Sequence, residues 1–317
     1  MKPHYFLFFL LIITVVSCKK DEPYVPSVNV FSYTPAGGAI LNDIVFTGSD
    51  TGYVSCSNGM VLKTINGGTS WVAIQAAATD ISLQFLSFVN SRIGFASGGN
   101  AFGEKLYKTT DAGTTWTLLG SNFDYDEIEF VDQNIGYMLN LDQLYKTTNG
   151  GTMWTMINPL NSFDYPENVV FLSKDTGFVR DRQGFFYWTT NGGTTFSVNS
   201  NSSASSQFIS FNKTGRKSGA AFTLTSAYTT SDAGVTWTSH GSWDHNYEAY
   251  AFSGRGNNFV VSGDQVLVLS KDGGNTFTNY YNQEGITVQD NLKKNTVTPD
   301  GKIFCIGELG HIYRITF

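Results

Sequence analysis

One ten-residue segment, present six times, constrains this chain more than any other feature. The second copy reads KTTDAGTTWT from Lys108, and the others begin at Lys63, Lys146, Trp188, Thr229 and Leu269. Their closing aromatic residues recur about every 40 residues, at Trp71, Trp116, Trp154, Phe196, Trp237 and Phe277. A regular period of this length is typical of propellers and other repeat architectures. We call these six segments the turn repeats.

Each turn repeat combines turn residues with β-forming residues on both sides. Its shared core is Ser/Thr-x-Asp/Asn-x-Gly-x-Thr/Ser-Trp/Phe. The Asp or Asn can accept hydrogen bonds from the backbone N–H groups of the residues that follow it, and the Gly can adopt a positive φ. We therefore expect a self-satisfied hairpin turn in which the Asp or Asn is structural. Met153 replaces Thr/Ser in the third copy, so one side-chain hydrogen bond should be missing there. The structural Asp and Asn residues are Asn66, Asp111, Asn149, Asn191, Asp232 and Asp272.

A second pattern precedes the turn repeats and divides each unit into four expected strands. A Phe is followed six residues later by Gly and then an aromatic residue. In the sixth unit Phe252 leads to Asn258-Phe259, and the fifth unit is stretched from Phe211 to Gly219. We expect strand A around the Phe, strand B after the Gly, strand C entering the turn repeat and strand D leaving it. The regular pairs are Phe46 and Gly52, Phe88 and Gly94, Phe130 and Gly136, and Phe171 and Gly177.

The two ends of the globular part predict how the array closes. Asn295–Phe317 offers strands A, B and C but no turn repeat, while Val28–Tyr33 is a β-forming stretch without a unit of its own. Pairing the two completes a four-stranded blade and removes a sheet edge. The expected fold is therefore all-β, a seven-bladed β-propeller of four-stranded antiparallel blades. Six blades with an irregular tail is the alternative.

The N-terminus has the features of an export signal followed by a tether. Lys2 precedes the apolar run Tyr5–Val16, which is short for a membrane span. We expect a signal peptide over residues 1–17, a charged, Pro-containing tether over 18–27 and a single propeller over 28–317. Val15-Val16-Ser17-Cys18 resembles the bacterial lipobox, which implies lipidation of Cys18 and anchoring in the outer membrane or at the cell surface. An ordinary secretory signal that happens to contain Cys18 is the alternative.

The composition excludes several classes of function. The net charge is −6, whereas nucleic-acid binding needs clustered Lys and Arg. The sequence has no G-x-S-x-G, H-E-x-x-H, C-x-x-C, Walker or dinucleotide-binding motif. We expect a monomer without cofactor or metal, although His240, Asp244 and His245 leave a metal cluster as an alternative. Cys56 and Cys305 are expected on strands B of neighbouring blades, either as buried thiols or as a disulfide.

The turn repeats resemble the Asp-box, or BNR repeat, of sialidases, sortilin-type receptors and propellers similar to photosystem II assembly factors. The whole mature domain resembles the photosystem II stability and assembly-factor-like family, which implies a scaffolding or assembly role. The run after Cys18 resembles the tethers of Bacteroidota lipoproteins. The sialidase resemblance implies an enzyme that clamps a carboxylate with three arginines. Among the arginines here, only Arg180 and Arg182 are expected to approach the face where propeller active sites usually lie.

Three linkers between a strand D and the next strand A share one composition. Each carries an aromatic residue, an Asp, a second ring and then a Glu just before strand A. All D–A linkers must emerge on one face, opposite the turn repeats, so we expect these residues to gather at the mouth of the central channel. Exposed aromatic residues among carboxylates suit recognition of a protein or glycan, and capping of the blades is the alternative. The candidate binding residues are Phe123, Tyr125, Glu127, Phe163, Tyr165, Glu167, Arg182, Trp243, His245 and Glu248.

These observations predict a lipid-anchored, non-enzymatic propeller. It would bind an unknown protein or glycan at the channel mouth and act as a binding or assembly scaffold. A sialidase-like hydrolase that uses acidic residues at the same mouth is the alternative.

Overall fold

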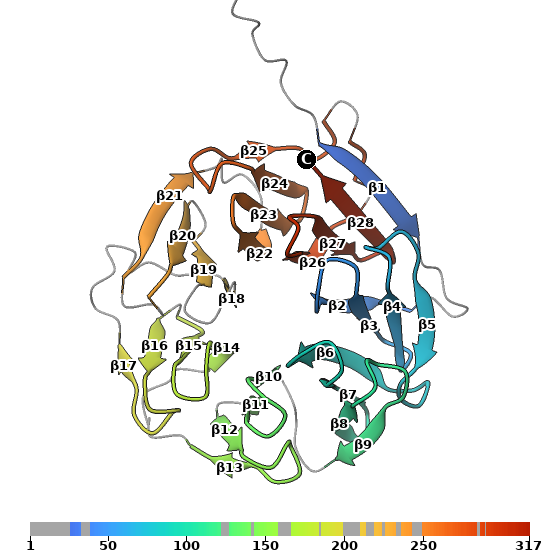
Figure 1. Cartoon of the computed structure of the whole chain (residues 1–317), viewed down its shortest axis with the longest axis vertical. Coiled ribbons are helices and arrows are strands. Elements are labelled where there is room, and N and C mark those ends of the chain that lie inside the picture. The colour runs from blue at the N-terminus through green and yellow to red at the C-terminus, as the bar shows by residue number, and fades with distance from the viewer. Residues whose placement is uncertain are drawn as a thin grey trace, which may run out of the picture.

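The chain folds into a ring of seven four-stranded antiparallel sheets around a central axis (Figure 1). No helix of the described residues is long and apolar enough to cross a membrane. The computed structural model describes residues 26–32, 39–121, 127–140, 143–157, 166–183, 185–198, 210–213, 219–223, 226–232, 236–242, 249–283, 286–288 and 290–317.

Six blades are continuous in sequence, and each supplies strands A to D from the channel outwards. This order follows the prediction from the sequence. Blades 1 to 3 contain β2 (Leu41–Phe46), β3 (Gly52–Cys56), β4 (Met60–Thr64), β5 (Val72–Gln75), β6 (Ser82–Phe88), β7 (Gly94–Asn100), β8 (Gly103–Thr109), β9 (Thr117–Gly120), β10 (Glu127–Phe130), β11 (Gly136–Asn140), β12 (Gln143–Thr147) and β13 (Thr155–Met156). Blades 4 to 6 contain β14 (Pro166–Phe171), β15 (Gly177–Asp181), β16 (Phe186–Thr189), β17 (Ser197–Val198), β18 (Ser210–Lys213), β19 (Gly219–Phe222), β20 (Ser226–Thr230), β21 (Thr238–Ser242), β22 (Ala249–Arg255), β23 (Asn258–Gly263), β24 (Val266–Ser270) and β25 (Thr278–Asn279).

Blade 7 joins the two ends of the described chain. It contains β26 (Leu292–Val297), β27 (Ile303–Gly307) and β28 (His311–Thr316), and β1 (Ser27–Ser32) is its outermost strand. Strand β1 runs antiparallel to β28, with Ser27 opposite Thr316 and Ser32 opposite His311. The predicted seven blades and the predicted closure by the N-terminal strand are therefore confirmed. The ring closes without leaving the long strand β28 as an exposed edge.

The Phe–Gly pairs are directly opposite each other at the end of strand A and the start of strand B. Phe46 faces Gly52, and a Cβ on Gly52 would lie 2.6 Å from the Phe46 ring. The same pairing occurs in blades 2 to 4. Glycine is therefore needed for steric reasons, because the Phe ring lies flat over the neighbouring strand.

In the fifth and sixth units the pairing differs from the prediction. Lys213, not Phe211, lies opposite Gly219. In blade 6 the pair is reversed, since Phe259 on strand B lies opposite Gly254 on strand A. A Cβ on Gly254 would lie 2.1 Å from the Phe259 ring, so the ring still covers a glycine. The spacing from Phe252 was misleading because the A–B turn of this blade is shorter.

Buried apolar clusters lie mostly between adjacent blades. One contains Leu41 and Ile44 of blade 1 together with Phe304 and Ile306 of blade 7. The described residues form seven such clusters. Burying these side chains supplies the main favourable free energy of the fold and fixes each blade to its neighbour.

Cys56 and Cys305 are free, fully buried thiols. Cys56 packs into the cluster between blades 7 and 1, whereas Cys305 packs into the cluster between blades 6 and 7. Burial raises the pKa of Cys56 to about 12 and shifts that of Cys305 in the same direction. Of the two alternatives left by the sequence, the structure therefore has buried thiols.

Candidate binding channel

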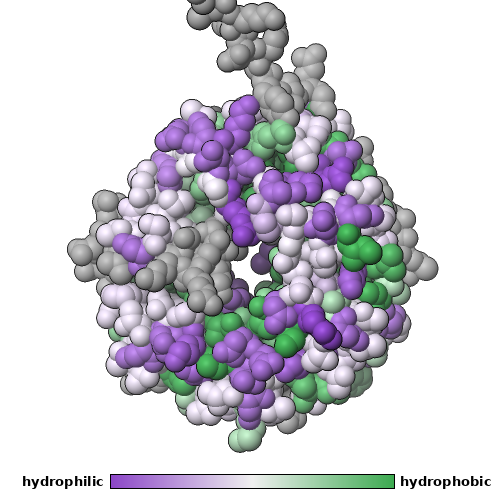
Figure 2. Space-filling view, viewed as in Figure 1, coloured by the Kyte–Doolittle hydropathy of each residue, from purple (hydrophilic) through white to green (hydrophobic). Residues whose placement is uncertain are grey.

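The A strands enclose an open channel at the centre of the ring (Figure 2). Its described part has a volume of about 520 Å³ and is lined by residues of β2, β6, β10, β14, β22 and β26. Polar side chains of these strands point into the channel, whereas their apolar side chains pack between adjacent blades. We call this cavity, with its acids Asp43, Glu127 and Glu129 and its cation Lys294, the channel site.

Asp43 joins the inner strands of blades 1 and 2. Its carboxylate accepts the backbone N–H of Ile44 at 2.9 Å and the N–H of Leu86 in β6 at 2.9 Å. A β-bulge next to Asp43 turns the side chain toward the neighbouring blade, which is a common effect of bulges. Burial raises the pKa of Asp43, while the positive charge of Lys294 and the two N–H donors oppose that rise.

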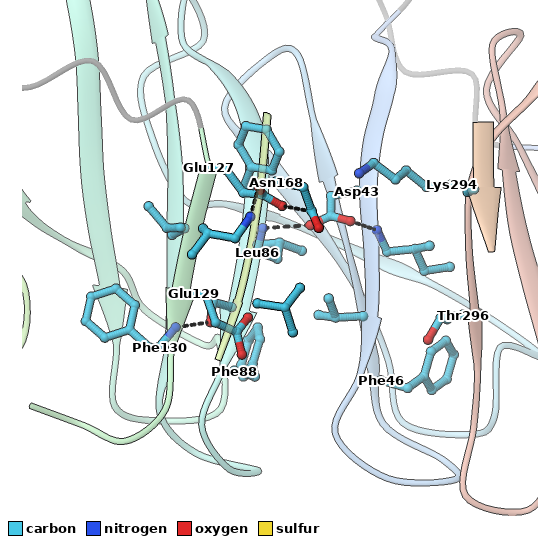
Figure 3. A pocket seen from close by; sticks show the side chains of 18 of the residues that line it. Asp43, Phe46, Leu86, Phe88, Glu127, Glu129, Phe130, Asn168, Lys294 and Thr296 are labelled. Carbon is cyan, nitrogen blue, oxygen red and sulfur yellow. Dashed lines mark hydrogen bonds between the residues drawn. The ribbon is translucent and has the colours of Figure 1, made fainter. Parts of the chain in front are cut away.

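Glu127 makes the equivalent connection between blades 3 and 4. One carboxylate oxygen accepts the amide N–H of Asn168 at 2.8 Å, and the other accepts the backbone N–H of Val169 at 2.8 Å (Figure 3). Burial raises the pKa of Glu127 to about 7, against the opposing charge of Lys294. Near neutral pH this carboxyl group therefore exists in both protonation states.

Lys294 enters the channel from β26 and faces the two acidic residues (Figure 3). Its charge acts on both Asp43 and Glu127, and its Nζ lies 5.9 Å from the centroid of the Phe85 ring. No ion pair joins Lys294 to a carboxylate among the described residues. The channel site thus holds a half-buried ammonium group, which carries three hydrogen-bond donors.

Of the ten predicted binding residues, the structure describes Glu127, Glu167 and Arg182. Glu127 lines the channel, but Glu167 forms an ion pair of 2.8 Å with Arg180 and does not line it. Arg182 is exposed in the turn after β15. Glu127 and Glu167 lie at the start of strands A, and Arg182 lies in a B–C turn. The predicted residues outside the described part of the chain are Phe123, Tyr125, Phe163, Tyr165, Trp243, His245 and Glu248.

Most residues of the channel site are absent from the predicted binding residues. The predicted residues come mainly from linkers before strand A, whereas Asp43, Glu129 and Lys294 lie within strands A. Charged residues inside an otherwise apolar inner strand were the available signal, because such side chains must find water or a partner.

The turn repeats hold themselves together, as expected. Asp111 accepts the backbone N–H groups of Thr114 and Thr115 at 3.1 and 2.9 Å and the hydroxyl of Thr109 at 2.8 Å. Its second oxygen accepts the hydroxyl of Thr115 at 2.7 Å. These bonds, with that of the Thr115 hydroxyl foremost, lower the pKa of Asp111 to about 2. In the third repeat Met153 supplies its backbone N–H to Asn149 but has no hydroxyl to add.

The arginines do not form a carboxylate clamp in the described channel. Its described lining contains none of them. Arg180 is paired with Glu167, and Arg314 donates to the carbonyl of Gly67 and the hydroxyl of Thr69. The described residues also contain no group of three His, Cys, Asp or Glu side chains that could hold a metal ion.

The fold is shared with binding proteins and with enzymes. No protein-family model matches the sequence, and no curated protein matches it either. Among solved structures, YCF48 bound to a D1 peptide has a TM-score of 0.70 and 18% identity, with 93% of this chain and 98% of that chain covered. The GH74 enzyme of Niastella koreensis has a TM-score of 0.65 and 16% identity, with 87% and 52% covered. Virginiamycin B lyase from Staphylococcus aureus has a TM-score of 0.71 and 10% identity, with 92% and 100% covered.

Proposed function

We propose that this protein is a lipid-anchored binding or assembly propeller that holds a peptide segment of a protein partner at the channel mouth. The observation that carries the proposal is the channel site itself. It is open, polar and rigid, because Asp43 and Glu127 are fixed by bonds to the backbone of the next blade. Lys294 has no ion-pair partner in the part of the chain that the structure describes, and rigid polar groups around such a cation suit recognition of backbone carbonyls and side-chain acceptors.

The same contacts argue against proton transfer as the main task of the acids. Both oxygens of each carboxylate already accept N–H donors. One donor to Asp43 and both donors to Glu127 belong to the inner strand of the next blade. Moving either side chain toward a substrate would leave buried N–H groups unpaired, which costs about 1–3 kcal/mol for each group. The likeness to YCF48, solved with a D1 peptide, is compatible with a peptide ligand in this fold.

A glycan-acting hydrolase remains the second candidate because one observation favours it. The pKa of Glu127, about 7, is suited to a general acid at neutral pH. A sialidase-like activity predicts release of a fluorophore from a sialoside by the wild type and its loss in Glu127→Gln. Turnover of that kind would replace binding as the primary function.

Site-specific photo-crosslinking tests the binding proposal. Tyr250 lines the channel and is 43% exposed, so a photoreactive p-benzoylphenylalanine at this position should capture the partner in cells. The matched control is Met153, which is 71% exposed on the turn-repeat face. We expect one protein product from position 250 that is missing from position 153 and weakened by Lys294→Met. Equal capture at both positions, or capture unaffected by Lys294→Met, would contradict the proposal.

The anchor is tested separately at Cys18. A clickable palmitate analogue should label the wild type and fail to label Cys18→Ala, because the thiol is the proposed attachment site. Equal labelling of both proteins would remove the anchor from the proposal and leave the channel site unaffected.

A further inference from the structure

Pairs of aromatic rings join adjacent blades near the turn-repeat face. A ring from strand A of one blade stacks on a ring from strand B of the preceding blade. Phe88 on Tyr53 is an example, with centroids 4.1 Å apart and planes within 14°. Three other junctions repeat the arrangement, with centroid distances of 4.3, 3.4 and 3.3 Å: Phe46 on Phe304, Phe130 on Phe95 and Phe171 on Tyr137.

A lysine on strand C completes three of these junctions. Lys63 lies over the ring of Tyr53, and both its Nζ and the Tyr53 hydroxyl donate to the carbonyl of Ala112 in the next turn repeat, at 2.7 and 2.9 Å. Lys146 likewise donates to the carbonyl of Gly192 at 3.0 Å. Lys108 lies over the ring of Phe95 and donates to the carbonyl of Gln133 at 3.4 Å instead. In the junctions of Lys63 and Lys146, the residue directly after the Asp or Asn of the next turn repeat therefore accepts a bond from the preceding blade.

The junction between blades 5 and 6 lacks both of these side chains. By strand register Ala220 stands where blade 1 has Tyr53, and Thr229 stands where it has Lys63. Blade 6 still supplies an aromatic ring to this junction. It is the ring of Phe259, which covers Gly254 on the opposite strand. A cavity of about 240 Å³ lies between Ala220 and Phe259. An apolar cavity of about 150 Å³ is large enough to bind benzene, so one aromatic ring fits here.

The acceptor of this junction also lacks its usual donor. Gly273 directly follows Asp272, as Ala112 follows Asp111, and its φ of +77° resembles the +61° of Ala112. Gly273 lines the cavity, yet no side chain of a described residue donates to its carbonyl. The neighbouring polar group, His240, is engaged with the Thr229 hydroxyl at 2.6 Å.

We propose that this cavity binds a phenolic ring. The ring stacks on Phe259 in the space left by Ala220, and its hydroxyl donates to the carbonyl of Gly273, as Tyr53 donates to Ala112. A free phenol and a tyrosine side chain of a partner share this chemistry. The cavity opens beside the exposed Arg255 and Gly256 on the turn-repeat face, so the proposal does not depend on the channel site.

The test uses p-cresol, the side-chain analogue of tyrosine, with the purified full-length protein in detergent. Saturation-transfer NMR should show binding by the wild type, and 4-methylanisole, which cannot donate a hydrogen bond, should bind about tenfold more weakly because the Gly273 carbonyl stays unpaired. Ala220→Tyr fills the cavity and should abolish p-cresol binding while raising the Tm. N-acetyltyrosinamide distinguishes the sources: binding comparable to that of p-cresol supports a tyrosine of a partner, and its exclusion supports a free phenol.

A second variant covers the case in which Ala220→Tyr does not fold. Thr229→Lys places an ammonium group at the position in blade 5 that corresponds to Lys63 in blade 1. The new lysine should donate a hydrogen bond to the Gly273 carbonyl and so remove the advantage of p-cresol over 4-methylanisole. Three results would each overturn the proposal: no p-cresol signal in the wild type, undiminished binding in a folded Ala220→Tyr variant, or equal affinity of both probes for the wild type.

Discussion

At the scale of single residues, Glu127 has the most informative environment. Its half-buried carboxyl group lies at the start of β10 and accepts hydrogen bonds from Asn168 and Val169 of β14. The charge of Lys294 opposes the rise of its pKa. Desolvation dominates these effects, so the neutral form is favoured well above the usual range of a glutamate. Glu127, which the sequence analysis proposed as a binding residue at the channel mouth, lines the channel and also connects two inner strands.

This environment predicts how stability depends on pH. The folded-state pKa of Glu127, about 7, exceeds the ordinary 4.5, so its contribution to stability is fully present below pH 4.5 and is lost as the pH rises through 7. Glu127→Gln removes the titration. We expect urea titrations to give a free energy of unfolding for each protein, and the value for the wild type minus that for Glu127→Gln should be larger at pH 5 than at pH 8. A difference that is the same at both pH values would show that the carboxyl group titrates as if solvated.

At the scale of the element, the turn repeat is a hairpin turn held by one carboxylate or amide oxygen. The backbone N–H and the Ser/Thr hydroxyl meet at this oxygen in copies with Asp and in copies with Asn. The two residue types are interchangeable because both provide the same acceptor atom. Charge is therefore secondary to geometry in this turn.

Substitution of Asp111 tests that interpretation. Asp111→Ala should destabilise the protein by about 1 kcal/mol, since the N–H groups that it leaves are partly reached by water. Asp111→Asn is the matched control and should be nearly neutral at pH 7. Because the folded-state pKa of Asp111 is about 2, below the ordinary 3.8, its contribution is present above pH 3.8 and is lost as the pH falls through 2.

Thermal melting of both variants between pH 5 and 2 measures the two effects together. From near equality at pH 5, the Tm of the wild type should fall below that of Asp111→Asn as the pH approaches 2, because only the wild type is protonated there. Loss of channel-site binding in Asp111→Ala without a change in Tm would contradict a structural role.

At the scale of the whole molecule, the ring depends on one short strand. Six backbone pairs join β1 to β28 across almost the full length of the chain. Removing residues 1–33 should leave β28 as an open edge and promote edge-to-edge association. We expect size-exclusion chromatography to show oligomers and thermal unfolding to become less cooperative. The control begins at Pro26, retains β1 and should stay monomeric. A monomeric, cooperatively unfolding deletion variant would mean that β1 is dispensable for closure.

Local chemistry determined the fold in this chain. The turn repeats, the Phe–Gly pairs and the incomplete last unit encode strand order and ring closure, because turns and strand pairing depend on residues near in sequence and on a fixed period. The sequence could not place the polar lining of the channel, since Asp43, Glu127 and Lys294 come from different blades and acquire their properties only through burial and proximity. It also could not reveal the cavity at Ala220. The small side chain of Ala220 leaves a cavity because the strand register places Phe259 and Gly273 of the next blade opposite it.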